Sequence, residues 1–403
     1  MPPRHRRLTP ERLRRHLGLL VVMLWAVAII DAATPTWQLR TGQIKGTDFV
    51  HFYTLARIGL QDKPGAFADL EAQRVLQLAV RPESRNDWYP PAYGPQVAVL
   101  LAPLGFLSYG AALVAWLAIT TVVYVAAVRS VGTRCPHLAS YKSLLVLGAA
   151  AFPPFWDLIL HGQLSAIALL AVVTAWSALR AGHAVLAGAA LGILGYKLSL
   201  LLPVLAILLL TGSWTMLSAA LAVTIGQVGI GAWVSGPGSL QAYVQMVGNS
   251  PRLLSTLAAK PYQMHSWRAF WLLLWPAQLP SLVLYVLSGG VTALLAASVW
   301  RRYKDPSLRM SALVIAMVLC SPHLYVYDLV ILAPVWMWLT DRYLAMPTLP
   351  GIVGWTLYAG YAAPLLGPIV GTLAHLQLSV ICFAALLWYL WRLDWRDSNE
   401  SMA

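Results

Sequence analysis

Apolar runs of about 15 to 21 residues recur along almost the whole chain. Trp and Tyr gather at the ends of these runs, where aromatic side chains anchor helices at the membrane–water interface. A run of roughly 20 apolar residues is long enough to cross a bilayer as a helix. The pattern therefore predicts an all-α, polytopic membrane bundle of about twelve transmembrane helices. The predicted spans are 17–33, 111–129, 143–158, 163–180, 183–198, 199–211, 214–234, 281–300, 307–322, 326–341, 348–364 and 371–391.

The apolar run 92–107 is ambiguous, because it follows the helix-breaking sequence Tyr89-Pro90-Pro91. It is either a thirteenth span or a helix that enters the membrane without crossing it. Positive charge decides between the two, since Arg and Lys favour cytoplasmic segments. Six arginines precede the first span, and only a non-crossing 92–107 places the later basic segments on the same side. We therefore expect a re-entrant or juxtamembrane helix there and cytoplasmic termini. The basic residues concerned are Arg129, Arg134, Lys142, Arg180, Arg301, Arg302, Lys304, Arg309, Arg342, Arg392 and Arg396.

The composition agrees with a membrane protein. Of 403 residues, 59% are hydrophobic and only 11% are charged, whereas about a quarter of residues are charged in soluble domains. The net charge of +13 lies between apolar segments, so membrane orientation explains it better than nucleic acid does. We expect no nucleic-acid partner. We interpret 1–403 as one integral membrane domain, with 1–16 as a basic cytoplasmic tail and the first span as an uncleaved signal anchor.

Cysteine and histidine spacing argues against disulfides and metal sites. Cys135, Cys320 and Cys382 are far apart, and the nine histidines form no HxxxH or HxH array. We therefore expect neither a metal nor a cofactor.

Two external segments stand out in this topology. The first external loop, 34–110, carries juxtamembrane helices, and its part 34–91 holds six of the 15 acidic residues beside seven basic ones. The second, 235–280, holds basic residues, and no acid occurs between Asp157 and Asp305. Uncompensated positive charge on the outer face opposes the usual orientation rule and indicates an anionic ligand. The basic residues of this second loop are Arg252, Lys260, His265 and Arg268.

The stretch GTDFVHFYTLARIG, residues 46–59, contains a carboxylate in the first external loop. On a helix, Asp48, His51, Phe52 and Leu55 would share one face, placing a carboxylate beside an imidazole. The aromatic side of such a helix is expected to lie on the membrane. Spacing alone favours a plainer interpretation, in which Asp48 is stabilised by the helix dipole at an N-terminus and His51 is an interfacial polar residue. Asp87, before the turn at 88–91, is expected to form that turn through its side chain.

Other polar residues lie near the predicted outer ends of spans. Lys197, in LGILGYKLSLLLP, lies inside an apolar run. It either marks a ligand site or snorkels to the interface. Asp157, His161 and Gln163 in FPPFWDLILHGQ and Asp328 in SPHLYVYDLVILAP are at the same predicted depth. This convergence on one side of the membrane is more informative than any single residue, although each could simply bond a neighbouring helix.

Five short motifs in order resemble family 87 of the glycosyltransferases, in the C superfamily of membrane enzymes. They are DFVHFYTLARIG, YPPAYGPQVAVLLAPLG, HGQLSAIALL, AGAALGILGYKLSLLLP and SPHLYVYDLVILAP, which together run from about residue 46 to 335. Members of the family, including an actinobacterial mannosyltransferase of phosphatidylinositol mannoside synthesis, use polyprenyl-phosphate sugars on the outer side of the membrane. Where many relatives read SPxSWxHH, this chain has Ser321, Pro322, Tyr325, Tyr327 and Asp328, so both histidines are absent.

The resemblance implies an inverting glycosyltransferase of the bacterial cytoplasmic membrane. It would move a sugar, with mannose as the first expectation, from a polyprenyl-phosphate donor to a hydroxyl of a lipid or glycan acceptor outside the cell. The resemblance implies Asp48 as general base. Such a transfer needs a base for the hydroxyl and positive charge for the departing phosphate. The expected donor-phosphate contacts are Lys197, Arg252, Lys260 and Arg268, and the expected substrate contacts are His51, Tyr89, His161, Gln163, His323, Tyr327 and Asp328.

Two other classes compete with this interpretation. A transporter or flippase of lipid-linked sugars would also place charges at membrane depth. It predicts inverted repeats and no large external loops, whereas this sequence has no internal repeat and two large external segments. A membrane-bound acyltransferase would need a buried histidine with an Asn or Asp partner, and His161 is the one candidate for it.

Overall fold

The computed structural model describes residues 9–60, 69–88, 93–248 and 260–395. These residues form helices, and the only strand-like pairings within them are isolated bridges from Gln38 to Ile44 and from Met264 to Tyr325. The α-helices are α1 (Pro10–Ala32), α2 (Phe49–Gly59), α3 (Leu70–Val80), α4 (Pro95–Gly105), α5 (Tyr109–Gly132), α6 (Pro136–Ala139), α7 (Lys142–Ala150), α8 (Pro153–His161), α9 (Ser165–Arg180), α10 (Ala184–Gly192), α11 (Leu198–Thr211), α12 (Trp214–Ser235), α13 (Pro237–Gly248), α15 (Trp267–Leu274), α16 (Gln278–Arg302), α17 (Pro306–Cys320), α18 (Ala333–Ala345), α19 (Gly351–Leu373) and α20 (Leu378–Arg392). The 3₁₀ helices are η2 (Pro82–Asn86), η3 (Ile193–Tyr196), η4 (Pro261–Gln263) and η5 (Val326–Leu332).

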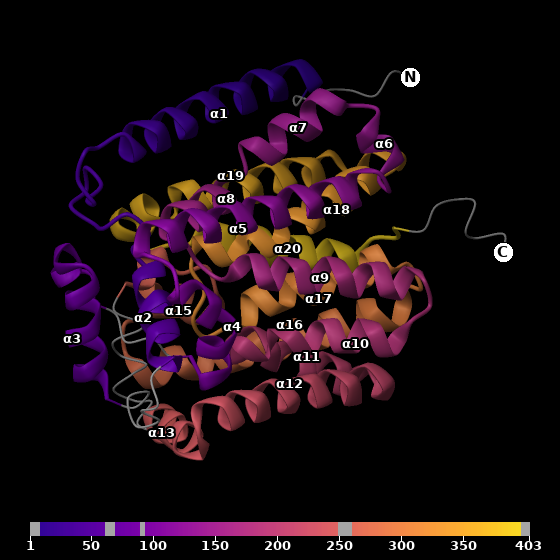
Figure 1. Cartoon of the computed structure of the whole chain (residues 1–403). Helices are drawn as coiled ribbons and strands as arrows, with labels where there is room; N and C mark the ends of the chain where they lie inside the picture. The colour runs from indigo at the N-terminus through magenta and orange to yellow at the C-terminus, as the bar shows by residue number, and fades with distance from the viewer. Residues whose placement is uncertain (1–8, 61–68, 89–92, 249–259, 396–403) are drawn as a thin grey trace.

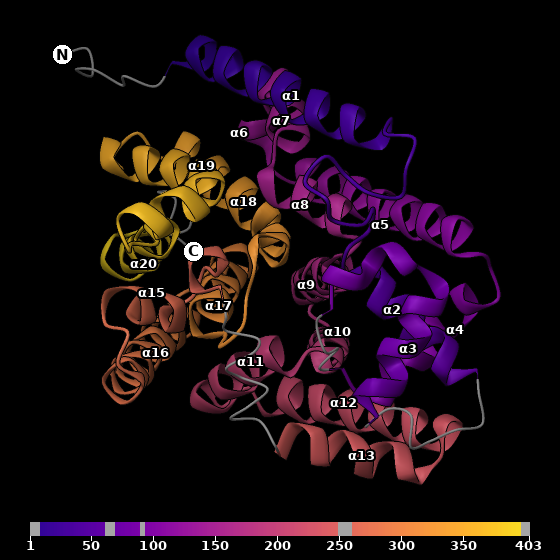
Figure 2. The ribbon, with the colours of Figure 1, turned by 90° about the vertical axis from the view of Figure 1, so that its left-hand side faces the viewer.

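The long helices run side by side along one axis, from α1 on one face of the bundle to α12 on the opposite face (Figure 1). A view nearly along this axis places α9 in the interior, between α5, α8 and α10 (Figure 2). Apolar side chains cover α9 on nearly all sides, and Leu169, Val172 and Trp176 are fully buried. Helix α17 is equally apolar and buried over Met310–Leu319. A helix that is hydrophobic all round belongs in the interior, as these two are.

Each predicted span lies mainly on helical structure. Five helical segments of the described chain are long and apolar enough to cross a membrane: α1, α5, the continuous pair α7–α8, α12 and α16. The shorter apolar helices include α4, α9, α11, α17 and α20, so a membrane helical bundle is supported while the number of crossings stays a prediction. One predicted boundary is wrong, because α19 continues through Pro364 and Pro368 to Leu373. Membrane helices tolerate proline where neighbouring groups satisfy the freed backbone carbonyl.

Helix α4 covers most of the ambiguous run 92–107. Its 11 residues rise about 17 Å, which is little more than half of the roughly 30 Å hydrocarbon core of a bilayer. It packs beside α2 and α12. The short length supports the expectation that this run does not cross.

The basic segments of the chain meet at one end of the bundle, where α1 begins and α20 ends (Figure 1). Arg14 of α1 donates through Nε to Ser143 Oγ of α7 at 3.0 Å. Arg302 of α16 donates to the Trp391 carbonyl of α20 at 2.7 Å, and Arg342 pairs with Asp305. The grouping is what the charge pattern along the sequence predicts for one membrane face.

The opposite end of the bundle carries α2, α3, α13 and α15 (Figure 1). The sequence suggested that α2 lies on the membrane with an aromatic side, and this is wrong. Nearly every residue of α2 is buried, including Phe49, His51 and Phe52, because α3, α4 and α5 pack around it. The apolar residues on all faces of α2 are the signal of a buried helix rather than an interfacial one.

A close helix contact fixes the start of α11. A β-carbon at Gly192 of α10 would lie 2.5 Å from the Ala220 carbonyl oxygen of α12, so only glycine permits this approach. Thr224 Oγ1 and Gln227 Nε2 of α12 donate to the Gly192 carbonyl at 3.1 and 2.8 Å. These bonds hold η3 and therefore set the position of Lys197, which follows it directly.

Candidate active site

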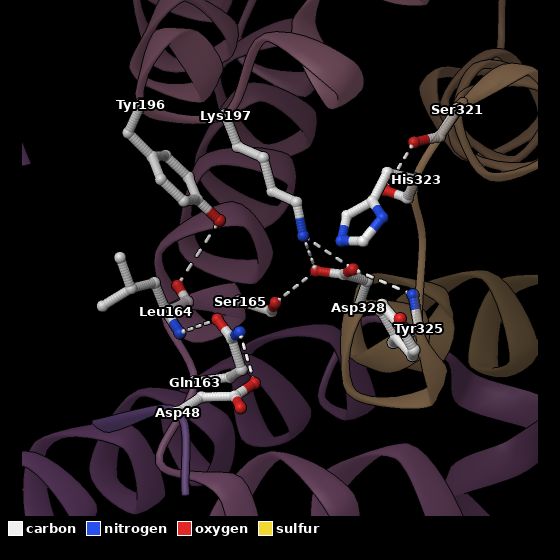
Figure 3. Close-up of polar contacts among 10 residues, drawn as sticks. All are labelled: Asp48, Gln163, Leu164, Ser165, Tyr196, Lys197, Ser321, His323, Tyr325 and Asp328. Atoms are coloured by element: carbon white, nitrogen blue, oxygen red, sulfur yellow. Dashed lines mark hydrogen bonds and ion pairs between the residues drawn. The ribbon is translucent and has the colours of Figure 1, made fainter. Parts of the chain in front are cut away.

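The carboxylate of Asp48 lies half-buried at the start of α2 and does not cap the helix. Asp48 occupies the N-cap position but makes no side-chain capping bond. Its Oδ2 instead accepts a hydrogen bond from Gln163 Nε2 at 2.7 Å, and its backbone N–H donates to the His161 carbonyl at 3.0 Å. Asp48 therefore lies at a helix N-terminus, as the plainer interpretation expects, but its side chain bonds Gln163 rather than the helix. The carboxylate is held toward the 161–163 turn (Figure 3).

Backbone geometry and side-chain hydrogen bonds hold the 161–163 turn in one conformation. Gly162 has φ of +65°, and a β-carbon there would come 2.7 Å from Phe49 Cβ, so glycine is required twice over. Trp116 Nε1 on α5 donates to the carbonyls of Gly162 and Gln163 at 3.1 and 3.2 Å. Gln163 Oε1 accepts from the Leu164 N–H at 2.9 Å. With its oxygen fixed in this way, the Gln163 amide must aim its NH₂ group at Asp48.

A second carboxylate lies beside the same turn. Asp157 Oδ1 of α8 is 3.4 Å from His161 Nδ1, one helical turn later, and both side chains are 28% exposed. His161 Nδ1 is also 2.9 Å from the Asp157 carbonyl oxygen, so Nδ1 is directed at the protein. The His161 ring lies 5.7 Å from that of Tyr327. Asp157 therefore belongs to the candidate site, although the sequence pattern indicated for it only that it lies at the same depth as other polar groups.

Lys197 and Asp328 form a buried ion pair. Lys197 Nζ lies 2.6 and 2.7 Å from the two carboxylate oxygens of Asp328, and the Asp328 side chain is fully buried. Ser165 Oγ donates to Oδ1 at 2.6 Å, and the Tyr325 N–H donates to Oδ2 at 3.2 Å. The Lys197 ammonium also faces the ring of Tyr327, at 5.6 Å from its centroid. Lys197 points into the bundle (Figure 3), so the snorkelling interpretation is wrong.

The remaining residues of the first external loop hold the Asp48 segment in place. Asp87 is buried, and its Oδ2 accepts from the Ile44 N–H at 2.9 Å, so it ties the loop to the residues before Asp48. Most of the 88–91 turn lies outside the described residues, so the role of Asp87 in that turn stays a prediction. His51 is buried with its ring 5.9 Å from that of Trp88. Burial lowers the pKa of His51, against the opposite influence of Asp48 and Asp87. His51 therefore packs inside the first external loop, beside Trp88. Tyr89 lies outside the described residues.

The second external loop reaches the same end of the bundle. Met264 pairs with Tyr325, and the His265 N–H donates to the Leu324 carbonyl at 3.0 Å. His265 itself is fully buried, and desolvation lowers its pKa to about 3. Arg268 Nη1 of α15 is 3.4 Å from the Pro322 carbonyl oxygen, which places it next to His323.

His323 and Lys260 are partly exposed in the structure. The His323 ring lies 4.9 Å from that of Tyr325. Arg252, another expected phosphate contact, lies outside the described residues. In the part of the chain that is described, no three His, Cys, Asp or Glu side chains form a group that could hold a metal ion.

The described site brings together four chain segments: the start of α2, the end of α8 with the 161–163 turn, Lys197 and the 321–328 segment (Figure 3). The sequence model of glycosyltransferase family 87 matches residues 92–322, which is more than half of the chain. The chain belongs to glycosyltransferase family 87. No curated protein and no solved structure matches the chain. The family match confirms the resemblance seen in the motifs and covers Asp157, His161 and Lys197. Asp48 lies well before the matched residues, and Asp328 lies shortly after them.

Proposed function

We propose that this family 87 glycosyltransferase moves a sugar, mannose in the first instance, from a polyprenyl-phosphate donor to a hydroxyl of a lipid or glycan acceptor. The supporting observation is the half-buried carboxylate of Asp48, held by Gln163 at the end of the bundle that also carries Lys197 and Arg268. Sugar transfer from a phosphate needs a base near the acceptor and cations near the leaving group. Both requirements are met by side chains at this end.

The reaction proposed is a single inverting displacement. Asp48 accepts the proton of the acceptor hydroxyl as the hydroxyl oxygen bonds to the anomeric carbon. The bond from that carbon to the phosphate oxygen breaks, and the polyprenyl phosphate leaves with the electron pair. A carboxylate can serve here because the hydroxyl becomes more acidic as the new bond forms. Gln163 positions the base, and His161, fixed by Asp157, presents its other ring nitrogen for a substrate oxygen.

Lys197 is proposed to contact the donor phosphate together with Arg252, Lys260 and Arg268. An ammonium group has three N–H donors. Two of them bond Asp328, and these are its acceptors among the described residues, so one donor remains for a phosphate oxygen. The pairing restricts Lys197 to one position, which is the preorganisation that transition-state stabilisation requires. Tyr89, His323 and Tyr327 complete the proposed substrate contacts. Asp328 acts on the substrate indirectly, by holding Lys197.

Incubating the purified protein with a panel of polyprenyl-phosphate sugars tests the proposed activity. Release of polyprenyl phosphate with transfer to an added acceptor is the expected result for one sugar of the panel. A nucleotide-sugar donor supplied in parallel should give no product. Turnover of the nucleotide sugar, with no reaction of any lipid-linked donor, would overturn the proposed donor class.

We also propose that the Asp48 end of the bundle faces outward from a bacterial cytoplasmic membrane and that the basic end faces the cytoplasm. The expected result is that a cysteine at Glu71, exposed on α3, reacts with a membrane-impermeant maleimide in intact cells. A cysteine at Lys304, exposed at the basic end, should react only after the cells are opened. Each cysteine is introduced into a variant in which Cys135, Cys320 and Cys382 have been replaced. The reverse labelling pattern would place the active site in the cytoplasm.

A further inference from the structure

A cavity of about 420 Å³ lies among α1, α5, α7, α18 and α19 in the half of the bundle that carries the basic segments. Its walls are mostly apolar, and they include Leu13 and Leu17 of α1, Leu144 of α7, Met337 of α18 and Leu357 of α19. Specific ligand sites in proteins have volumes of about 300–1,000 Å³ and are lined mainly by such side chains. The size and lining fit an apolar ligand of extended shape.

Three of the tyrosines in the cavity wall have hydroxyl groups that are bonded to the protein. Tyr124 donates to the Ala149 carbonyl at 2.8 Å, and Tyr361 donates to the Gly148 carbonyl at 2.7 Å. The Tyr358 hydroxyl is 2.8 Å from His16 Nδ1. These residues thus contribute ring surface to the cavity rather than hydrogen bonds, which favours a hydrocarbon ligand over a polar one.

Helix α1 separates this cavity from the surrounding membrane. It packs against α7, and none of the residues in its apolar stretch is buried inside the protein. On the other side, α1 is joined to α19 through the His16–Tyr358 contact. Because α1 itself faces lipid, a hydrocarbon chain that reaches the cavity past α1 comes from the surrounding bilayer.

Basic side chains lie beside the cavity at the membrane surface. Tyr141 lines the cavity, and the next residue, Lys142, is exposed. Arg14, one residue after the lining Leu13, reaches across to Ser143 of α7. An anionic headgroup near these cations is attracted by their charge. We propose that this cavity binds one acyl chain of an anionic phospholipid, whose headgroup lies on Lys142 and Arg14.

The donor lipid is the less suitable occupant. Helix α5 extends from the Asp48 end of the bundle to the basic end with 24 residues, which correspond to about 36 Å. A donor whose phosphate lay beside Lys142 could not also present its sugar to Asp48. The bulk phospholipid of the leaflet at the basic end satisfies both the apolar wall and the nearby charge.

The test compares a cavity-filling variant with a matched control. Gly148 of α7 lines the cavity, and a β-carbon there would meet nothing closer than Leu17 Cδ1 at 4.0 Å, so Gly148→Phe adds a ring at the cavity wall. Gly226 of α12 has open space around it, and Gly226→Phe is the control. By native mass spectrometry in mixed phosphatidylglycerol and phosphatidylcholine, wild type and Gly226→Phe should retain one phosphatidylglycerol per chain. Retention should fall at least tenfold in Gly148→Phe and several-fold in Lys142→Glu.

Photo-crosslinking of the wild-type protein gives an independent readout. Phosphatidylglycerol with a diazirine in its acyl chain should label peptides that contain Leu13, Leu17 or Leu144. Equal retention of phosphatidylglycerol by Gly148→Phe and Gly226→Phe, or labelling elsewhere only, would overturn the site. Equal retention of phosphatidylcholine would overturn the headgroup claim, and displacement of the lipid by polyprenyl phosphate would overturn the choice of occupant. Catalysis enters none of these measurements, so their outcome is separate from that of the proposed function.

Discussion

Asp48→Asn should lower turnover by about 10²–10⁴-fold, which is the usual contribution of a positioned general base. The asparagine keeps the shape of the side chain and retains an oxygen that can accept the hydrogen bond from Gln163. It has no basic oxygen for the acceptor proton. Donor binding should persist, because the proposed phosphate contacts are on other segments. The measurement is steady-state turnover beside direct donor binding, each made on the variant and on wild type.

Asp87→Asn is the matched control for this prediction. Asp87 is also a carboxylate of the first external loop, but its oxygen accepts from the Ile44 backbone. The substitution should therefore cost much less activity than Asp48→Asn and show its effect mainly as lower stability. Near-normal turnover of Asp48→Asn, or an equal loss in both variants, would leave Asp48 without a role as base.

Lys197→Met should lower the free energy of unfolding by about 3–5 kcal/mol, the usual effect of removing one partner from a buried ion pair. The methionine fills a similar volume but leaves the fully buried carboxylate of Asp328 without its cation. A snorkelling lysine would give a much smaller effect. The measurement is unfolding of the purified variant in detergent by denaturant or heat, followed by helix content.

The double variant Lys197→Met, Asp328→Asn separates the ion pair from other consequences of the substitution. Because the asparagine is neutral and can still bond Ser165 and the Tyr325 N–H, the double variant should recover much of the lost stability. Its donor use should stay impaired, since the proposed phosphate contact is absent. Wild-type stability in the single variant would contradict the buried pair.

Hydropathy predicted the helices well because burial in lipid or in protein demands long apolar segments, and these are visible in any window of the sequence. The same signal could not separate lipid-facing helices from buried ones, which is why α2 was placed at the membrane surface. Prolines were a weak guide to boundaries for a related reason: α19 passes through Pro364 and Pro368, since its neighbours rather than its own sequence determine whether the helix continues.

The polar residues of the site were partly predictable. Convergence of Asp48, His161, Gln163 and Lys197 at one depth followed from where each lies relative to a predicted span. The pairings did not follow, because Gln163 is 115 residues from Asp48 and Lys197 is 131 residues from Asp328. Such bonds depend on which helices become neighbours. They show that the Asp48 carboxylate is held by Gln163, and they decide between the two interpretations of Lys197, which pairs with Asp328 and does not snorkel.

The residues at positions 327 and 328 affect the charge at the site. Many relatives resembling this chain read two histidines there, whereas this chain has Tyr327 and Asp328. Asp328 supplies a fixed negative charge to Lys197 at 2.6 Å. Part of the positive charge available to a donor phosphate is therefore already neutralised, which increases the expected contribution of Arg268 and Lys260 in this protein.

Single-turnover transfer from the reacting polyprenyl-phosphate sugar, followed in wild type and in Asp48→Asn with enzyme in excess over donor, tests the central claim most directly. Product formation and polyprenyl phosphate release should occur together in wild type, with inverted configuration at the anomeric carbon. Both should slow by about 10²–10⁴-fold in Asp48→Asn at saturating donor. Retained configuration, or a release step that is as fast in the variant as in wild type, would contradict direct displacement with Asp48 as the base.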